Sequence, residues 1–231
     1  MKVQILPLLE GAKQARGLTV IIDVFRAFSL EAYLQEKGAK EIIPVATIEE
    51  AFQLRQQFPE AILVGERNGI MVPGFDFGNS PSELEQVEVR GKRIIHTTSA
   101  GVQGLIAAKN ASEIVTGALV NAKATCNYIL SKKPEIVSLV PMGWNGIQET
   151  DEDQVCAEYM ASLLQDSQGP DLEKRIEALK EGEGKKFFDP TKPQFPQGDF
   201  ALCTKVDCLN GVNRVNVLYN QYYMKWEKYD E

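Results

Sequence analysis

The alternation of short apolar runs with amphipathic stretches is the feature that most limits what this chain can fold into. β-Branched runs of strand length recur through the first 143 residues, and helical patterns separate most of them. Strands that alternate with helices pair in parallel and are covered on both faces, because each helix carries the chain back across the sheet. We therefore predict an α/β fold with three layers, α/β/α, around a largely parallel or mixed central sheet.

The limits of the elements follow from the same runs. Thr47 and Glu50 have capping-box spacing, which begins a helix, and Pro44 suits a strand end or an edge strand. Strands are predicted at 18–24, 41–45, 61–66, 92–98, 112–118 and 135–143, and helices at 27–38, 47–58, 99–110, 121–133, 150–165 and 171–182. Segment 185–199, rich in Pro and Gly, is predicted to be irregular. The aromatic residues of the ambiguous tail are predicted to lie in the core or at subunit contacts.

The length of 231 residues favours one α/β domain over residues 1–231. A smaller C-terminal subdomain from about residue 166 is the alternative, and a homo-oligomer is compatible with either arrangement. No internal repeat or low-complexity tract divides the sequence.

Net charge and apolar content exclude several classes of partner. A formal charge of −7 and a pI near 5.0 argue against general binding to nucleic acid or to membrane surfaces. No apolar stretch approaches the roughly 18 residues of a transmembrane helix, and the first 17 residues lack the pattern of a signal peptide. We expect a cytoplasmic protein whose ligand, if anionic, is held by local positive charge.

Cysteine and histidine usage excludes some enzyme chemistry. The four cysteines form no C-x-x-C pair and are predicted to be cytosolic thiols. His96 is the single histidine, which makes a histidine-rich zinc site or a Ser-His-Asp triad hard to build. We assign His96 to packing.

Polar side chains gather where the predicted strands end. Ligands of parallel α/β sheets bind outside the carboxyl ends of the strands, so these groups are expected to share one crevice. The clusters are Asp23, Arg26 and Ser29; Glu66 and Arg67; Thr97, Thr98, Ser99 and Gly101; and Asp151, Glu152 and Asp153.

Each cluster also has a purely structural interpretation. Asp23 can end a strand, and Arg26 can form a surface ion pair, although a helix start favours acids over arginine. Segment 97–101 can be an ordinary N-cap as well as an anion site. Segment 150–153 has the spacing of a capping box, for which acids in the first turn are favourable in any case.

The segment Gly65–Glu83, GERNGIMVPGFDFGNSPSE, is too rich in Gly and Pro for a regular helix. A loop of this length inside a domain is usually functional or disordered, and its apolar residues argue for order. It carries Asp76, Asn79 and Ser80 beside Glu66 and Arg67. We predict an ordered loop that supplies groups to the site.

The combined chemistry points to phosphate and a hard cation. Several carboxylates without a histidine or cysteine cluster suit magnesium, which prefers oxygen ligands. Arginines and a hydroxyl-rich helix start suit a phosphate ester. No G-x-x-x-x-G-K-[ST] motif is present, which argues against a P-loop nucleotide hydrolase. Water and a side chain both remain possible nucleophiles.

The segments VIIDVFRAFS, EIIPVATIEEA, GERNG, GFDFGNSPSE, HTTSAG and DEDQVCA occur in an order and spacing that resembles the 2-phosphosulfolactate phosphatase family. GERNG joined to GFDFGNSPSE is the most specific part, and the resemblance covers about Val20 to Ala157. It implies a three-layer α/β fold and a magnesium-dependent phosphatase acting on 2-phospho-3-sulfolactate in coenzyme M biosynthesis. The matching positions are Asp23, Arg26, Glu66, Arg67, Asp76, Gly78, Asn79, Ser80, Pro81, Thr97, Thr98, Glu152 and Asp153.

The resemblance and the strand-end clusters together give one candidate site. The catalytic candidates are Asp23, Arg26, Glu66 and Arg67. The substrate-binding candidates are Ser29, Asn79, Ser80, Thr97, Thr98, Ser99 and Gly101, and the magnesium candidates are Asp23, Glu66, Asp76, Glu152 and Asp153.

The sequence departs from the family pattern at Phe28, at 99–102 and at Pro141–Met142, all near the expected pocket. Reaction class therefore transfers better than substrate identity. Our leading hypothesis is a magnesium-dependent phosphatase for a small anionic phosphoester, 2-phosphosulfolactate or a related 2-phospho acid. The alternatives are a non-catalytic binder of phosphorylated or sulfonated metabolites and a phosphoryl-transferring or lyase relative.

Overall fold

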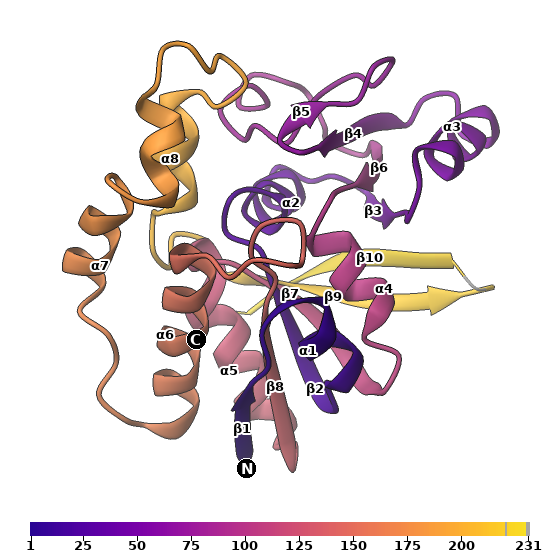
Figure 1. Cartoon of the computed structure of the whole chain (residues 1–231). Coiled ribbons are helices and arrows are strands. Elements are labelled where there is room, and N and C mark those ends of the chain that lie inside the picture. The colour runs from indigo at the N-terminus through magenta and orange to yellow at the C-terminus, as the bar shows by residue number, and fades with distance from the viewer. Residues whose placement is uncertain (220, 230–231) are drawn as a thin grey trace.

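A computed structural model describes residues 1–219 and 221–229, which form a 10-stranded mixed sheet with the strand order β1-β8-β2-β7-β9-β10-β3-β6-β4-β5 (Figure 1). One parallel block contains β1 (Lys2–Ile5), β8 (Ile136–Pro141), β2 (Gly17–Ile22) and β7 (Ala111–Gly117). A second contains β3 (Glu41–Pro44), β6 (Arg93–Thr97) and β4 (Ile62–Arg67), with the short β5 (Ile70–Met71) antiparallel at its edge. The predicted α/β fold is confirmed.

The antiparallel hairpin of β9 (Gly211–Leu218) and β10 (Gln221–Lys228) joins the two blocks. β9 pairs with β7, and β10 pairs with β3, both antiparallel. Counting these pairings shows that β3 runs opposite to β7. The two blocks therefore point in opposite directions, and the expectation that all the strands end at one edge of one parallel sheet is corrected.

Helices cover both faces of the first block. α1 (Leu8–Gln14) packs with α4 (Gly101–Ala107) on one face, and α5 (Ala122–Lys132) packs with α6 (Asp151–Gln165) on the other (Figure 1). α2 (Ala27–Glu36) lies against β9, β10 and β3, and α3 (Ile48–Gln57) lies against the second block. α7 (Leu172–Leu179), the 3₁₀ helix η2 (Glu183–Phe188) and α8 (Gln197–Cys203) form the outer left side of Figure 1. A further 3₁₀ turn, η1 (Leu119–Asn121), precedes α5.

The main core forms around the strands that read as continuous apolar runs. Leu18, Val20, Ile21 and Ile22 of β2 are all buried, as expected for a strand with helices on both faces. A smaller cluster of Leu179, Phe187, Phe195 and Phe200 lies between α7, η2 and α8, and Phe25 and Ile176 pack against it. In the described residues, no helix is long and apolar enough to cross a membrane.

Most predicted elements are confirmed within a few residues, with two corrections, and the ambiguous tail is now assigned. The Thr47–Glu50 capping box is present, and Pro44 ends β3. At Thr150, however, no side-chain cap bond is made at the start of α6. Segment 185–199 is not wholly irregular, because it includes part of η2 and the first turn of α8. The tail forms the β9–β10 hairpin.

We expect two glycine substitutions to separate backbone strain from steric overlap. Gly17 and Gly91 share a φ of +71°, but a Cβ at Gly17 would lie 2.2 Å from the carbonyl oxygen of Ile136, whereas a Cβ at Gly91 would have no neighbour within 4 Å. Gly91→Ala should cost about 1–2 kcal/mol of unfolding free energy from the left-handed backbone alone. Gly17→Ala should cost a further ~1–3 kcal/mol from overlap. Urea titration measures both, and equal losses would show that the β2–β8 contact is not tightly packed.

Candidate active site

A small cavity of about 40 Å³ lies where the ends of β2, β4, β6 and β8 come together with the loop before α8. Five sequence-predicted side chains with charged or polar groups line it, and the other lining residues come mainly from the β8–α6 loop and from aromatic positions. The lining residues are Asp23, Phe25, Arg26, Glu66, Gly69, Asn79, Ser99, Ala100, Gly143, Trp144, Asn145 and Phe195.

The carboxylate of Asp23 is held by backbone N–H groups of two helix starts. Its Oδ1 accepts from Ala27 N at 3.1 Å, and its Oδ2 accepts from Gly101 N at 3.0 Å. A Cβ at Gly101 would lie 2.8 Å from Oδ2 and 2.9 Å from the ring of Phe28. Gly101 is therefore needed for this close approach, and the bulky Phe28 packs directly behind the site.

Glu66 is held by the same segment after β6 and by the turn after β4. Its Oε1 accepts from Ser99 N at 2.7 Å, and its Oε2 accepts from Gly69 N at 2.6 Å and from Ser99 Oγ at 3.1 Å. Segment 99–101 thus binds two carboxylates. Ser99 binds that of Glu66, in β4, and Gly101 binds that of Asp23, directly after β2. The predicted convergence of Asp23 and Glu66 on one site is present, although their strands belong to oppositely directed blocks.

The acidic pair at the start of α6 also faces this region. Asp153 accepts from Val24 N at 2.7 Å and from Gly143 N at 2.8 Å, which ties α6 to the ends of β2 and β8. Glu152 is 4 % exposed, and its Oε2 has no hydrogen-bond partner in the described part of the chain. A buried carboxylate oxygen without a partner is costly, and coordination of a ligand is one way to satisfy it.

Burial raises the pKa values of these acids. Burial, reinforced by the charge of Glu66, raises the pKa of Asp23 to about 6, although the N–H groups of Ala27 and Gly101 oppose the shift. Burial raises the pKa of Glu152 to about 7, against the lowering effect of Lys186. The pKa of Asp153 lies well above its ordinary value because of burial and the charges of Glu152 and Asp23. The site therefore carries more acid than its own cations neutralise.

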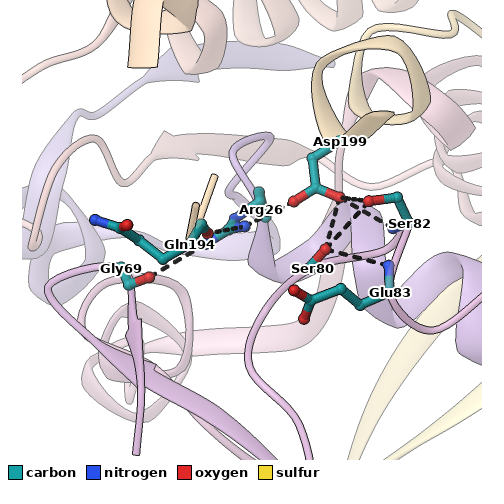
Figure 2. A network of polar contacts seen from close by, with 7 residues as sticks. All are labelled: Arg26, Gly69, Ser80, Ser82, Glu83, Gln194 and Asp199. Atoms are coloured by element: carbon teal, nitrogen blue, oxygen red, sulfur yellow. Dashed lines mark hydrogen bonds and ion pairs between the residues drawn. The ribbon is translucent and has the colours of Figure 1, made fainter. Parts of the chain in front are cut away.

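Arg26 is fixed by a buried ion pair. Its Nη1 donates to Asp199 Oδ2 at 2.7 Å and to the Gln194 carbonyl at 3.0 Å, and its Nη2 donates to the Gly69 carbonyl at 3.3 Å (Figure 2). Asp199 is fully buried, and its Oδ1 accepts from Ser80 Oγ, Ser82 N and Ser82 Oγ. These contacts use three of the five N–H donors of the guanidinium, so Arg26 keeps donors for a ligand.

Asn79 is oriented by a buried chain of side chains. Its Oδ1 lies 3.0 Å from His96 Nε2, and His96 Nδ1 lies 2.7 Å from Glu31 Oε1. His96 and Glu31 are completely buried. With its oxygen facing His96, the amide nitrogen of Asn79 is available to the cavity that Asn79 lines. His96 therefore packs, as predicted, and also positions a cavity residue.

Several sequence-predicted site residues are engaged elsewhere. Asp76 accepts from Leu63 N and from Arg55, on the α3 side of β4, so it is not brought to the cavity. Arg67 donates to Thr97 Oγ1 and to the carbonyls of Glu66 and Ala46, and it does not line the cavity. The hydroxyls of Ser29, Thr98 and Ser80 bond to Val24 O, Val102 N and Asp199 respectively, and therefore support the site from outside the cavity.

The sequence reasoning missed Asp199, Phe195 and Lys186. All three belong to segment 185–199, which its Pro- and Gly-rich composition predicts to be irregular and which has no strand-end signal. The ammonium of Lys186 faces the rings of Phe25, Trp144, Phe187 and Phe195. The sequence offers one hint, because Asp199 stands directly before the apolar residues 200–203 at the end of a segment rich in Pro and Gly.

The donor set is compatible with a magnesium ion that keeps much of its water. Within the residues that the structure describes, no three acidic, histidine or cysteine side chains are grouped as a metal cage. Magnesium ordinarily takes only one or two carboxylates directly and completes its shell with water and phosphate oxygens. The partnerless Glu152 Oε2 and the excess of acid at Asp23, Glu66 and Asp153 fit this mode of binding, whereas Asp76 does not.

Comparison with known proteins identifies the family. The model of the 2-phosphosulpholactate phosphatase family matches residues 5–216. The chain belongs to this family. It is therefore a phosphoric monoester hydrolase by descent, and the resemblance predicted from the motifs is confirmed.

Curated relatives carry the same name. A probable 2-phosphosulfolactate phosphatase of Bacillus subtilis is 33% identical over 191 residues, which are 81% of this chain and 82% of that protein. One of Carboxydothermus hydrogenoformans is 41% identical over 165 residues, 71% of this chain and 68% of that protein. The matched region of the family model includes Asp199 and Lys186, beyond the segment Val20–Ala157 that the motifs cover.

Removal of Asp199 tests whether its ion pair holds the site together. Asp199→Ala leaves a buried guanidinium without its carboxylate and is expected to cost about 3–5 kcal/mol of unfolding free energy. Glu10→Ala, which removes an exposed partner of Lys13, should change the free energy by less than about 1 kcal/mol. Urea titration of both variants provides the measurement. A loss below about 1 kcal/mol for Asp199→Ala would contradict this role.

Proposed function

We propose that this protein is a magnesium-dependent phosphatase that hydrolyses 2-phosphosulfolactate or a closely related 2-phospho acid. The observation that supports this most strongly is the gathering of Asp23, Glu66, Arg26 and Asn79 around one cavity, with Glu152 and Asp153 beside it. This collection suits a phosphoryl group and a divalent cation together. The substrate is inferred from the names of the family and of its relatives.

The charge balance supports a bound cation. Burial raises the pKa values of Asp23, Glu152 and Asp153, and the charges of other carboxylates add to the shift at each of them. Without a cation this site would repel an anionic phosphoester. When bound, magnesium would neutralise phosphoryl oxygens and lower the pKa of a bound water. Asp23, Glu66, Glu152 and Asp153 are the residues that would hold it, directly or through water.

The protein's own groups account for binding and proton transfer. Arg26 retains N–H donors and is held rigidly by Asp199, so it can bind phosphoryl oxygens in a fixed orientation. The amide nitrogen of Asn79, which also lines the cavity, can donate to the same group because its oxygen faces His96. A carboxyl group with a pKa of about 6, as at Asp23, gives up and takes a proton near neutral pH, which suits general acid–base catalysis.

Location, pathway and assembly remain predictions. The described cysteines are all free thiols, which supports the cytoplasmic location. Participation in coenzyme M biosynthesis rests on the family name, and a homo-oligomer rests on the aromatic tail. The competing function is binding of phosphorylated or sulfonated metabolites without turnover, and phosphoryl transfer is a third possibility.

Phosphate release from a panel of acidic phosphoesters tests the proposed activity. With magnesium the wild-type protein should release phosphate from 2-phosphosulfolactate, and chelator should abolish the release. Asp23→Asn should lower kcat/KM at least about 100-fold, because general acid–base groups typically contribute that much. Asp76→Asn removes a carboxylate outside the cavity and should retain activity within about threefold. Ligand-induced stabilisation without phosphate release would favour the binder.

The pH dependence of magnesium binding tests the metal site. Asp23 and Glu152, with pKa values of about 6 and about 7, must lose protons before they bind a cation, so affinity should fall as the pH falls through this range. Magnesium should therefore raise the melting temperature more at pH 8 than at pH 5.5. Asp76→Asn should keep this response, and Glu152→Gln should reduce it. The same magnesium shift at both pH values would argue against these ligands.

A further inference from the structure

Lys186 in η2 places a second cation beside the cavity. Its Nζ lies 5.7 Å from the ring centroid of Phe25, 5.1 Å from that of Trp144, 5.5 Å from that of Phe187 and 5.4 Å from that of Phe195. Contacts within about 6 Å of a ring face are attractive for an ammonium group. Three of these rings, Phe25, Trp144 and Phe195, also line the cavity. The aromatic residues thus hold the ammonium at the cavity wall.

The donors of this ammonium are not used by the protein. Among the described residues, Lys186 Nζ has no hydrogen bond and no carboxylate oxygen within ion-pair distance, and its contacts are with four aromatic rings. An ammonium has three N–H donors, and contact with ring faces fixes its position without using them in ordinary hydrogen bonds. A positioned cation with free donors is suited to an anionic ligand.

Arg26 and Lys186 lie against the same two rings. The guanidinium carbon of Arg26 is 5.9 Å from the Phe187 centroid and 4.8 Å from the Phe195 centroid. The buried carboxylate of Asp199 neutralises Arg26, whereas the described carboxylates that act on Lys186, those of Glu152, Asp23 and Glu183, lie beyond ion-pair distance. Burial and the nearby Arg26 lower the pKa of Lys186. An anion in contact with Nζ would oppose both of these pKa-lowering effects.

Lys186 also borders a wider hollow of about 700 Å³ over residues 180–192. The cavity of about 40 Å³ is smaller than the roughly 300 Å³ or more of ordinary ligand sites. A substrate with its phosphoryl group among Arg26, Asn79 and Asp23 would extend its remaining groups toward this hollow. Lys186 lines this hollow and its ammonium contacts three rings of the cavity wall.

On the basis of the proposed phosphatase function, we propose that Lys186 and the surrounding rings of Phe25, Trp144 and Phe195 form a subsite for the substrate's second anionic group. This group is the carboxylate or sulfonate that is not hydrolysed. The subsite makes the protein select phosphoesters that carry such an acid. Glu152 does not replace the ligand as partner of Lys186, because it lies beyond ion-pair distance and keeps its own Oε2 unsatisfied.

Substrate pairs and a matched variant test this subsite. Lys186→Met keeps an unbranched chain against the rings and removes the charge. Lys109→Met is the control, because Lys109 is exposed and lines neither the cavity nor the wider hollow. The substrates are 2-phospho-3-sulfolactate, 2-phospholactate and isopropyl phosphate, of which the last has a methyl group in place of the carboxylate.

Lys186→Met should lower kcat/KM at least 30-fold for an acid-bearing substrate and less than threefold for isopropyl phosphate. A loss for both acids assigns the subsite to the carboxylate, and a loss confined to 2-phospho-3-sulfolactate assigns it to the sulfonate. Lys109→Met should change none of the three by more than about threefold. Equal losses of Lys186→Met on all three substrates, or no loss on any, would overturn the proposal.

Binding of 3-sulfolactate, which has no phosphoester, separates this subsite from the proposed reaction. It should raise the melting temperature of the wild-type protein and not that of Lys186→Met. If the wild type hydrolyses no phosphoester but shows this difference, the proposed reaction fails and the subsite stands. If 3-sulfolactate stabilises both proteins equally, or neither, the subsite is wrong.

Discussion

Hydrogen bonds from one short segment, Ser99–Gly101, hold the two principal carboxylates of this protein together. Ser99 N binds Glu66, from the second strand block, and Gly101 N binds Asp23, from the first. The blocks run in opposite directions and pair only through the β9–β10 hairpin, so the site depends on this bridge. Each N–H pairs with a buried charged acceptor, a contact worth more than an ordinary hydrogen bond.

The same interaction explains why an acidic site forms in an acidic protein. Backbone N–H groups stabilise Asp23, Glu66 and Asp153 without adding positive side chains, while burial and, after it, neighbouring carboxylates raise the pKa values of Asp23 and Asp153. Two side chains supply positive charge beside these acids. Asp199 holds Arg26, and aromatic rings hold Lys186. The site thus has one acidic wall suited to a metal ion and one cationic wall suited to an anion.

The sequence predicted the local elements well, because periodicity and capping are local properties. The apolar run of β2 and the Thr47 cap of α3 are examples. It also predicted Asp23, Glu66, Arg26 and Asn79 at the cavity. It misplaced Asp76 and Arg67, because a strand-end position does not determine which way a side chain turns when Arg55 or Thr97 offers a partner. It missed Asp199 and Lys186, because their roles depend on contacts with residues more than 100 positions away.

The most direct test of the site is a crystal structure with Mn²⁺, as a substitute for magnesium, and inorganic phosphate. Anomalous diffraction locates the manganese ion unambiguously. The account predicts one manganese ion between the acids Asp23, Glu66, Glu152 and Asp153, with a phosphate that contacts it and Arg26. Manganese at Asp76, or bound by a cysteine sulfur, or phosphate bound away from Arg26, would contradict the account.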